Sequence, residues 1–327
     1  MKLGFKPAVI GELALLLFFS SCGGSFGGGI GGSGLVFGPI EDDNPAALLV
    51  EGVAFDTSEA EVLIDGEAAL ATELRTGMVV TVLGVIDDNG STGVAQTVEY
   101  DSVLEGPLQN VDLPSSSAQV LDTILLIDDD TVFDGFVFDP ASIGSDVEVS
   151  GFVDSGGGVR VTRLAPLRGD ATGFSLSGRV RNLDEAAKRF SLLSLTVDYA
   201  LATIVSGAAG PLREGLVAAV RFAAPPSGGL IQANRIRLTR PVRGREEGTT
   251  TLVQGIVTEV LTAQEFMLNG RLLVRTNADT RLVGDLRPSD ILPDIRLLVL
   301  GRVTADSAVL ARRIERRLLS GEPAPLP

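Results

Sequence analysis

Apolar and polar residues alternate along short stretches of this chain, and clusters of Asp, Asn, Gly, Pro and Ser separate the stretches. In Val79–Leu83, for example, the first, third and fifth side chains would point to one face of the backbone, and the second and fourth to the other. Alternation of period two with β-branched residues predicts a strand, and the polar clusters predict turns. The pattern therefore predicts an all-β protein. Residues 184–189 as a short helical turn, and residues 311–319 as a helix, are the helical alternatives.

Three sequence landmarks recur in the same order four times, which predicts an internal repeat. Each unit opens with an alternating strand that contains a glycine. Its middle has a turn residue, a six-residue strand and, in three copies, a second glycine. It ends with two apolar residues three positions apart. The opening glycines are Gly52, Gly106, Gly178 and Gly255; the middle strands are 77–84, 144–151, 215–222 and 294–301; the ends are 95–100, 161–166, 233–238 and 311–316.

The spacing of the opening glycines limits the size of each unit. They are 54, 72 and 77 residues apart, which leaves room for about five short strands. Five strands are too few for an immunoglobulin-like sandwich but suit a small barrel, whose closure removes exposed strand edges. Because bent barrel strands need glycine, we expect Gly178 and Gly255 at bends or bulges. The predicted fold is a tandem array of small five-stranded, OB-like β-barrel modules after a signal peptide and a Gly-rich tether.

The G-x-V openings, G-x6-G strands and A-x-x-[VI] endings resemble those of exported bacterial lipoproteins made of tandem small β-barrel modules, the family of domain of unknown function 5666. The resemblance extends from about Ala47 to Arg316 and is clearest in the third and fourth copies. It implies an OB-like module. It supplies no activity and no catalytic residues.

The first 22 residues have the layout of a bacterial lipoprotein signal. Lys2 and Lys6 precede an apolar run at 13–19, and two serines precede Cys22. The apolar run is too short to span a bilayer. We therefore expect cleavage before Cys22 and attachment of a lipid to its thiol, which would anchor the protein in a membrane. A plain secretory signal is the alternative. Gly23, in place of Asp, favours the outer membrane, with the protein facing the periplasm or the cell surface.

Glycine-rich sequence follows Cys22 and predicts a flexible tether, because so many glycines cannot pack a core. Cys22 is the single cysteine, so no disulfide can form within the chain and the cores must stabilise the modules. The expected boundaries are a signal peptide at 1–21, the tether at 22–46, β modules at 47–101, 102–169, 170–243 and 249–319, and a tail at 320–327.

Composition excludes several classes of enzyme. The chain has no His, which excludes Ser-His-Asp and Cys-His catalysis and the His-based zinc motifs. Arginines gather at 235–245 and 312–317, but the chain is acidic, has no Trp and is expected to be exported. These features argue against nucleic-acid binding, which uses basic grooves and aromatic platforms. We therefore expect no enzymatic activity, no cofactor and no nucleic acid.

Charge is divided unevenly along the chain. Residues 1–165 hold 26 acidic and 5 basic residues, and residues 166–327 hold 16 acidic and 22 basic residues. We favour two sets of solvated faces as the interpretation; contact between an acidic front and a basic back, or with an anionic surface, is the alternative.

An acidic run supplies the candidate metal ligands. Asp128, Asp129, Asp130 and Asp134 follow an apolar strand, and clustered carboxylates suit Ca²⁺. The spacing of an EF-hand is absent, and Asp also populates turns for backbone reasons. A calcium site and an ordinary turn are therefore both open.

Taken together, these observations predict an exported, lipid-anchored protein of the cell envelope that acts as a non-enzymatic scaffold or binding protein. Its partners would be the membrane, through Cys22, and an unknown envelope protein or polymer. A ligand-binding module for Ca²⁺ or an anionic envelope glycan is one alternative. An accessory subunit that pairs strand edges with an envelope assembly is another.

Overall fold

The computed structural model describes residues 32–44, 46–168, 173–206, 209–239 and 246–318. Throughout these ranges the chain forms strands joined by turns and short 3-10 segments, which confirms the all-β prediction. The two helical alternatives are wrong: residues 185–188 form a turn, and 311–316 belong to strand β26. Within the described ranges, no helix is long and apolar enough to cross a membrane.

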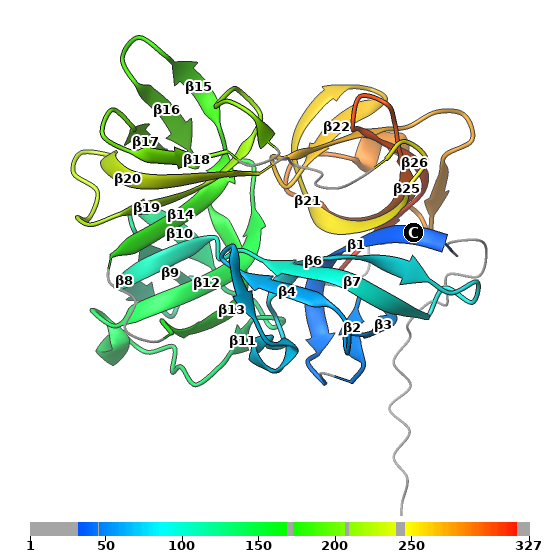
Figure 1. Ribbon diagram of the computed structural model, residues 1–327, viewed down its shortest axis with the longest axis horizontal. Helices are drawn as coiled ribbons and strands as arrows, with labels where there is room; N and C mark the ends of the chain where they lie inside the picture. Colours follow the sequence, from blue (N-terminus) through cyan, green and yellow to red (C-terminus); the bar gives the residue numbers. More distant parts are fainter. Residues whose placement is uncertain (1–31, 45, 169–172, 207–208, 240–245, 319–327) are drawn as a thin grey trace, which may run out of the picture.

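Four modules follow one another along the chain and lie two by two in space (Figure 1). Module 1 contains β1 (Gly32–Asp42), β2 (Leu48–Val50), β3 (Val53–Asp56), β4 (Glu61–Ile64), β5 (Glu67–Ala69), β6 (Val79–Ile86) and β7 (Thr92–Tyr100); module 2 contains β8 (Leu104–Asp112), β9 (Ser117–Val120), β10 (Thr123–Leu126), β11 (Val132–Phe133), β12 (Asp146–Val153) and β13 (Val159–Pro166); module 3 contains β14 (Phe174–Arg179), β15 (Arg181–Asp184), β16 (Arg189–Leu192), β17 (Leu195–Asp198), β18 (Thr203–Val205), β19 (Val217–Phe222) and β20 (Leu230–Thr239); module 4 contains β21 (Thr250–Thr262), β22 (Glu265–Leu268), β23 (Leu272–Arg275), β24 (Arg281–Val283), β25 (Arg296–Val303) and β26 (Val309–Arg316).

Each module closes as a five-stranded barrel. In module 2, β8 pairs with β9, β9 with β10, β10 in parallel with β13, β13 with β12, and β12 with β8. The other three modules repeat this order, with β14 and β15 together serving as the first strand of module 3. The order is that of an OB-fold barrel, so the predicted fold class is confirmed.

The strand that opens module 1 lies earlier than the sequence predicted. Residues 32–42 form β1, whereas the tether was predicted to run from 22 to 46. Leu35 and Val36 are fully buried, because the apolar residues between the glycines still alternate. Gly34 is needed for close packing, since a Cβ on it would lie 2.8 Å from the Ile86 side chain. High glycine content therefore concealed a barrel strand.

One glycine in the first strand of each module has the same structural role. The sequence analysis identified this glycine in modules 2, 3 and 4 but chose the wrong residue, Gly52, in module 1. Gly106, Gly178 and Gly255 lie in first strands, whereas Gly52 lies in the β2–β3 turn at a φ of 72°. The module 1 counterpart is Gly38, in β1. Each of these strand glycines faces the first residue of the next hairpin turn, and that residue has a left-handed backbone. These residues are Glu51, Leu121, Leu193 and Asn269, with φ of 50°, 50°, 49° and 54°.

Gly178 and Gly255 were predicted at bends or bulges, and neither is itself a bulged residue; the bulges of these first strands follow them, between Arg181 and Asp184 and between Val257 and Glu259. Gly178 pairs with Ala218, and Gly255 with Leu297, in uninterrupted registers. A second set of bulges lies at the closing glycine of the G-x6-G strand, at Gly84, Gly151 and Gly301. A Cβ on any of the three would collide with a carbonyl oxygen of the neighbouring strand. Glycine therefore makes room for this bulge in modules 1, 2 and 4, whereas module 3 forms the equivalent bulge at Phe222.

The turn residue that opens the same motif has a left-handed backbone in all four modules. Gly77, Gly144 and Gly215 have φ of 85°, 93° and 82°, and Asp294 has 71°. Asp is one of the few residues other than glycine that tolerates this region, which explains the departure in module 4.

The modules join in pairs through their first strands. β1 pairs in parallel with β21, joining modules 1 and 4, and β8 pairs antiparallel with β14, joining modules 2 and 3. The cores join as well, because Leu35 of β1 packs in the core of module 4 and Leu252 of β21 packs in that of module 1. Val79, Phe152 and Ile256 form a smaller apolar cluster where modules 1, 2 and 4 meet.

Candidate functional site

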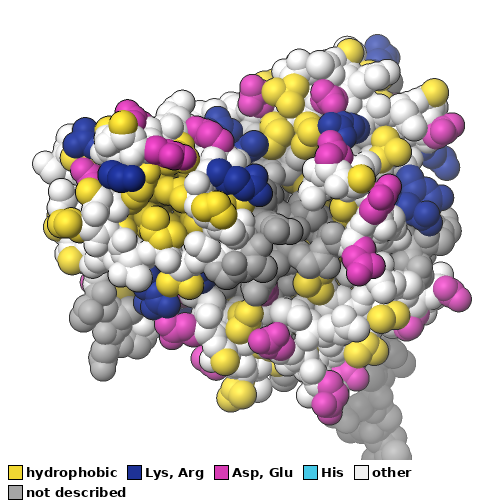
Figure 2. Space-filling model, turned by 45° about the horizontal axis from the view of Figure 1, so that its top comes forward, with side chains coloured by type: hydrophobic (Ala, Val, Ile, Leu, Met, Phe, Trp, Pro, Cys, Tyr) yellow, Lys and Arg dark blue, Asp and Glu magenta, His cyan; other side chains and the backbone are white. Residues whose placement is uncertain are grey.

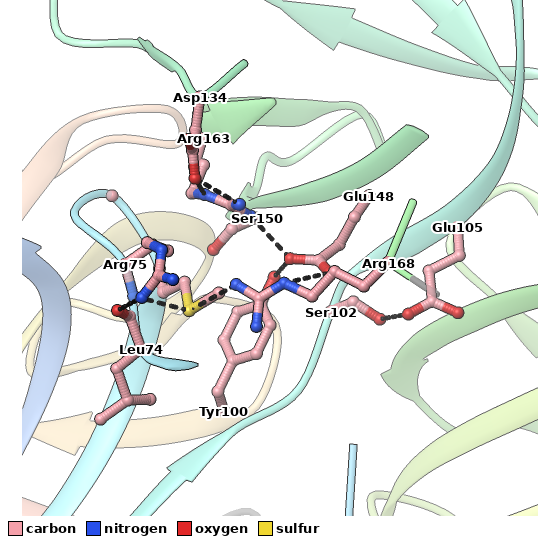
Figure 3. Close-up of polar contacts among 12 residues, drawn as sticks. Leu74, Arg75, Tyr100, Ser102, Glu105, Asp134, Glu148, Ser150, Arg163 and Arg168 are labelled. Carbon is pink, nitrogen blue, oxygen red and sulfur yellow. Dashed lines mark hydrogen bonds and ion pairs between the residues drawn. The ribbon is translucent and has the colours of Figure 1, made fainter. Parts of the chain in front are cut away.

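A buried polar network connects modules 1 and 2, and its centre is Glu148 on β12 (Figure 3). Only 2% of Glu148 is exposed. Its Oε1 accepts hydrogen bonds from the Tyr100 hydroxyl of module 1 at 2.9 Å and from Nη1 of Arg163 at 2.7 Å. Arg168 lies 3.5 Å from Oε2, and Arg163 also contacts Asp134 at 2.7 Å. The buried carboxylate is therefore compensated by hydrogen bonds and by opposite charge.

Backbone contacts tighten the same junction. The N–H of Val79 donates to the Ser150 hydroxyl at 2.8 Å, and the Thr162 hydroxyl donates to the Gly77 carbonyl at 2.6 Å. A Cβ at Gly77 would lie 2.6 Å from the Thr162 carbonyl oxygen. Module 1 thus rests on module 2 through the turn that opens its G-x6-G strand.

Two further carboxyl groups share one hydroxyl beside this network. Ser102 Oγ lies 3.0 Å from Asp65 Oδ1 and 3.0 Å from Glu105 Oε1. A hydroxyl has one proton to donate, so the second contact needs a proton on a carboxyl group. Burial, reinforced by Asp65, raises the pKa of Glu105 to about 7, and burial also raises the pKa of Asp65. This corner of the molecule is suited to hold a proton between two carboxyl groups.

A second junction, between modules 1 and 4, contains Glu51. Its side chain is 1% exposed and lies 3.5 Å from Arg317. The side-chain amide of Gln254 satisfies its neighbours when its nitrogen faces Glu51 and its oxygen faces Arg296. In this orientation the Gln254 nitrogen donates to the Glu51 carboxylate, and the Gln254 oxygen accepts from Arg296 at 2.6 Å. Burial raises the pKa of Glu51 to about 8, and Arg317 acts in the opposite direction.

Ion pairs connect the acidic half of the chain to the basic half, which the sequence analysis had left as the less favoured interpretation. Each has its carboxylate before residue 166 and its arginine after it, and they lie at junctions between modules. They are Arg168–Glu148, Arg237–Asp101, Arg296–Asp130 and Arg317–Glu51. The face in Figure 2 carries acidic and basic side chains intermixed, with apolar ones between them.

The four candidate calcium ligands do not form one site. Asp134 pairs with Arg163, and Asp130 with Arg296 at 3.4 Å. Asp128 accepts the N–H of Asp130 at 3.0 Å, as in an ordinary Asp turn, and Asp129 is exposed. Nowhere in the described ranges do three acidic or cysteine side chains lie close enough to hold a metal ion. The structure therefore does not bring these four carboxylates together, because arginines pair with two of them.

Cys22 lies outside the described residues, as do Arg240, Arg243 and Arg245, so lipidation of Cys22 stays a prediction. Sequence reasoning missed Glu51, Tyr100, Glu105, Glu148 and Arg163. In sequence Glu148 stands between two valines, where alternation predicts an outward, solvated side chain. It does point outward from its barrel, but a neighbouring barrel covers it.

Comparison with protein families gives an identification. The model described as domain of unknown function (DUF5666) matches residues 37–99, 105–164 and 254–315, which together make up more than half of the chain. The chain belongs to this family. The matches begin one residue before Gly38, Gly106 and Gly255, the strand glycines that face the hairpin turns. DUF5666 copies therefore coincide with modules 1, 2 and 4. Module 3 has the same strand order but lies outside the matches, although the sequence placed it among the clearest copies.

No curated protein matches the chain. Among solved structures, one titled "drosophila Unr CSD456" matches with 12% sequence identity, and the match covers 64% of this chain and 97% of that one. Its TM-score is 0.21, so the superposition supports no argument about function.

Proposed function

We propose that this DUF5666 protein is an exported, lipid-anchored protein of the cell envelope that acts as a rigid, non-enzymatic binding scaffold. Lipid on Cys22 would hold it at a membrane, in our proposal the outer membrane. The four barrels would present their faces, in a fixed arrangement, to an envelope protein or polymer. This combines the lipoprotein signal at 1–22 with the packing of the modules.

The observation that carries the scaffold proposal is the Glu148 network. Tyr100 of module 1 donates to a carboxylate of module 2 that is 2% exposed and is also bound by Arg163. Moving module 1 away would leave that buried charge with an unsatisfied acceptor, which is costly. Paired first strands add backbone hydrogen bonds at two other junctions. Modules that were flexibly linked and moved independently would not form such contacts.

The placement of ionisable groups supports a role without catalysis. Glu51 and Glu148 are buried and Glu105 is half-buried at junctions between modules, and arginines or hydroxyls contact them there. A general acid or base would have to face a cavity that admits a substrate. Packing between modules explains the positions of Glu51 and Glu148, and Asp65, which lines a small cavity, does so beside Arg221 and Arg237.

Intact mass and detergent partitioning of the natively expressed protein test the anchor, with Cys22→Ala as the matched control. We expect a lipid-sized mass increase and partitioning into detergent for wild type, and neither for the variant. If wild type is unmodified and stays in the aqueous phase, the anchor is disproved.

Distance measurement between spin labels tests the rigid scaffold. Labels at Leu113→Cys in module 2 and Leu292→Cys in module 4, both exposed, are placed in a Cys22→Ser background. We expect one narrow distance distribution. A broad distribution would show that the modules move independently and would refute the scaffold proposal, whatever the result for the anchor.

A further inference from the structure

We infer that module 4 carries a binding site for an uncharged, phenyl-bearing group at one end of its barrel. A cavity of about 100 Å³ lies there, between the β21–β22 hairpin, strand β24 and the short 3-10 turn η4 (Pro288–Asp290). Its apolar walls include Val260, Phe266, Leu282 and Ile291. The site is separate from the junctions described above, and the inference does not depend on the lipid anchor.

The hydroxyl groups of Thr276 and Thr280, which line the cavity, are already occupied. The Thr280 hydroxyl donates to the Ala311 carbonyl at 2.7 Å, and the Thr276 hydroxyl lies 3.4 Å from the Gln264 carbonyl. No charged side chain is among the lining residues. A charged ligand would therefore lose its hydration without gaining an opposite charge, whereas an uncharged, apolar group has little hydration to lose. The walls select an uncharged ligand.

A hydrogen-bond donor is available at the rim. Oδ1 of Asn277 accepts from the N–H of Asp279 at 3.0 Å, whereas its Nδ2 makes no hydrogen bond with any residue that the structure describes. A ligand with a hydroxyl or carbonyl beside its apolar part could accept from that amide. Few polar groups beside mostly apolar walls are typical of small-molecule sites.

Module 2 indicates the shape of the missing group. Phe133 and Leu282 hold equivalent positions, because each pairs with the second apolar residue of the end motif, Leu164 and Ile314 respectively. Phe133 stacks on Phe138, with ring centroids 5.6 Å apart and an interplanar angle of 22°. Module 2 thus has an aromatic ring, 37% exposed, at the strand position where module 4 has the smaller Leu282 beside a cavity.

Size and access agree with this assignment. A cavity of about 150 Å³ lined by Leu, Ile and Phe stays dry and binds benzene, so about 100 Å³ of free space beside an open mouth suits a single ring. Val260, at the edge of the cavity, is 41% exposed. The ring could belong to a free small molecule or to a Phe side chain of a peptide; the chemistry recognised is the same.

Ligand-observed saturation-transfer NMR tests the inference. The full chain with Cys22→Ser, which cannot be lipidated and keeps every described residue, is mixed with benzyl alcohol, with N-acetyl-phenylalanine amide and with phenylacetate. We expect saturation of one or both uncharged ligands and at least tenfold weaker binding of phenylacetate. The uncharged ligand that binds more tightly identifies the source of the ring. Absence of binding by both, or equal binding of phenylacetate, would overturn the inference.

A variant locates the site. Leu282→Phe should occupy the free space of the cavity and weaken binding at least tenfold, whereas Leu201→Phe, the same change at an 86% exposed position of module 3, should not. Circular dichroism and the melting temperature show whether Leu282→Phe is folded. If it is not, Ala263→Leu fills the cavity from the opposite wall. Unchanged binding in a folded, filled variant would place the ligand elsewhere and refute the site.

Discussion

Asn269 bridges the two residues that flank Gly255. Its Oδ1 accepts from the N–H of Ile256 at 2.8 Å, and its Nδ2 donates to the carbonyl of Gln254 at 3.1 Å. Asn269 occupies the left-handed turn position of the β22–β23 hairpin, and glycine leaves room for its amide against strand β21. In module 1 the same turn position holds Glu51, whose side chain contacts module 4 instead. The same turn position therefore stabilises a single barrel in module 4, through Asn269, and joins modules 1 and 4 through Glu51 in module 1.

Gly255→Ala should destabilise the protein by roughly 2–3 kcal/mol, because the new Cβ would overlap the Asn269 amide and break buried hydrogen bonds. Urea unfolding, followed by circular dichroism, measures the loss. Gly178→Ala is the matched control: its Cβ would meet Leu192 and Leu193 at 3.6 Å, an ordinary contact, so we expect a change within about 1 kcal/mol. Equal losses would contradict the role assigned to Asn269.

Arg163→Met should cost roughly 3–5 kcal/mol, because it leaves Glu148 buried without its closest cation. The loss should appear in the urea midpoint of the transition that separates modules 1 and 2. Arg189→Met removes an ion pair with Asp198 in which the arginine is 49% exposed, and should cost less than about 1 kcal/mol. A small loss for Arg163→Met would mean that the junction does not depend on this pair.

Stability should decrease as pH rises from about 4.5 to about 7, in part through Glu105. Burial beside Asp65 raises its pKa from 4.5 to about 7, so the folded protein binds this proton more tightly than the unfolded chain. The contribution is fully present below pH 4.5 and is lost as pH rises through about 7. In Glu105→Gln, the melting temperature should depend less on pH across this window.

Asp306→Asn is the control for that measurement. Hydrogen bonds from the Thr304 hydroxyl and Arg275 lower the pKa of Asp306 to about 2, so its titration lies below the window. The stability that it contributes is present above pH 3.8 and is lost as pH falls through about 2. Asp306→Asn should therefore keep the wild-type slope between pH 4.5 and 7. If Glu105→Gln also keeps that slope, the shared proton at Ser102 is disproved.

Much of the barrel architecture can be predicted from the sequence, because its signals are local. Period-two alternation predicted the strands, and the G-x6-G motif marked a left-handed turn, which few residues other than glycine adopt, and a bulge at its closing residue. Asp294 could replace the first glycine because Asp tolerates that backbone. The start of module 1 was missed because its high glycine content predicted a flexible tether. The apolar residues between those glycines nevertheless form β1, in which Leu35 and Val36 are fully buried.

The junctions could not be predicted from the sequence, because they depend on which outward faces meet. Glu148 and Arg163 lie on the outer surface of one barrel, where alternation predicts solvated side chains. Only the arrangement of the modules makes those positions interior. The acidic run at 128–134 shows the converse: arginines distant in sequence form ion pairs with Asp130 and Asp134, so the run does not act as one cluster of carboxylates.

The parallel pairing of β1 with β21 has a consequence for the order of events during synthesis. Residues 34–37 find their partners at 250–253, more than two hundred positions later. Until the fourth module has been made, β1 keeps an unpaired edge, and Leu35 lacks the core in which it is buried. Long-range pairing of this kind is slow to form, and a chain interrupted before residue 250 would expose a strand edge prone to aggregation. Module 1 is therefore synthesised first, but its β1 edge is covered only when the last module has been made.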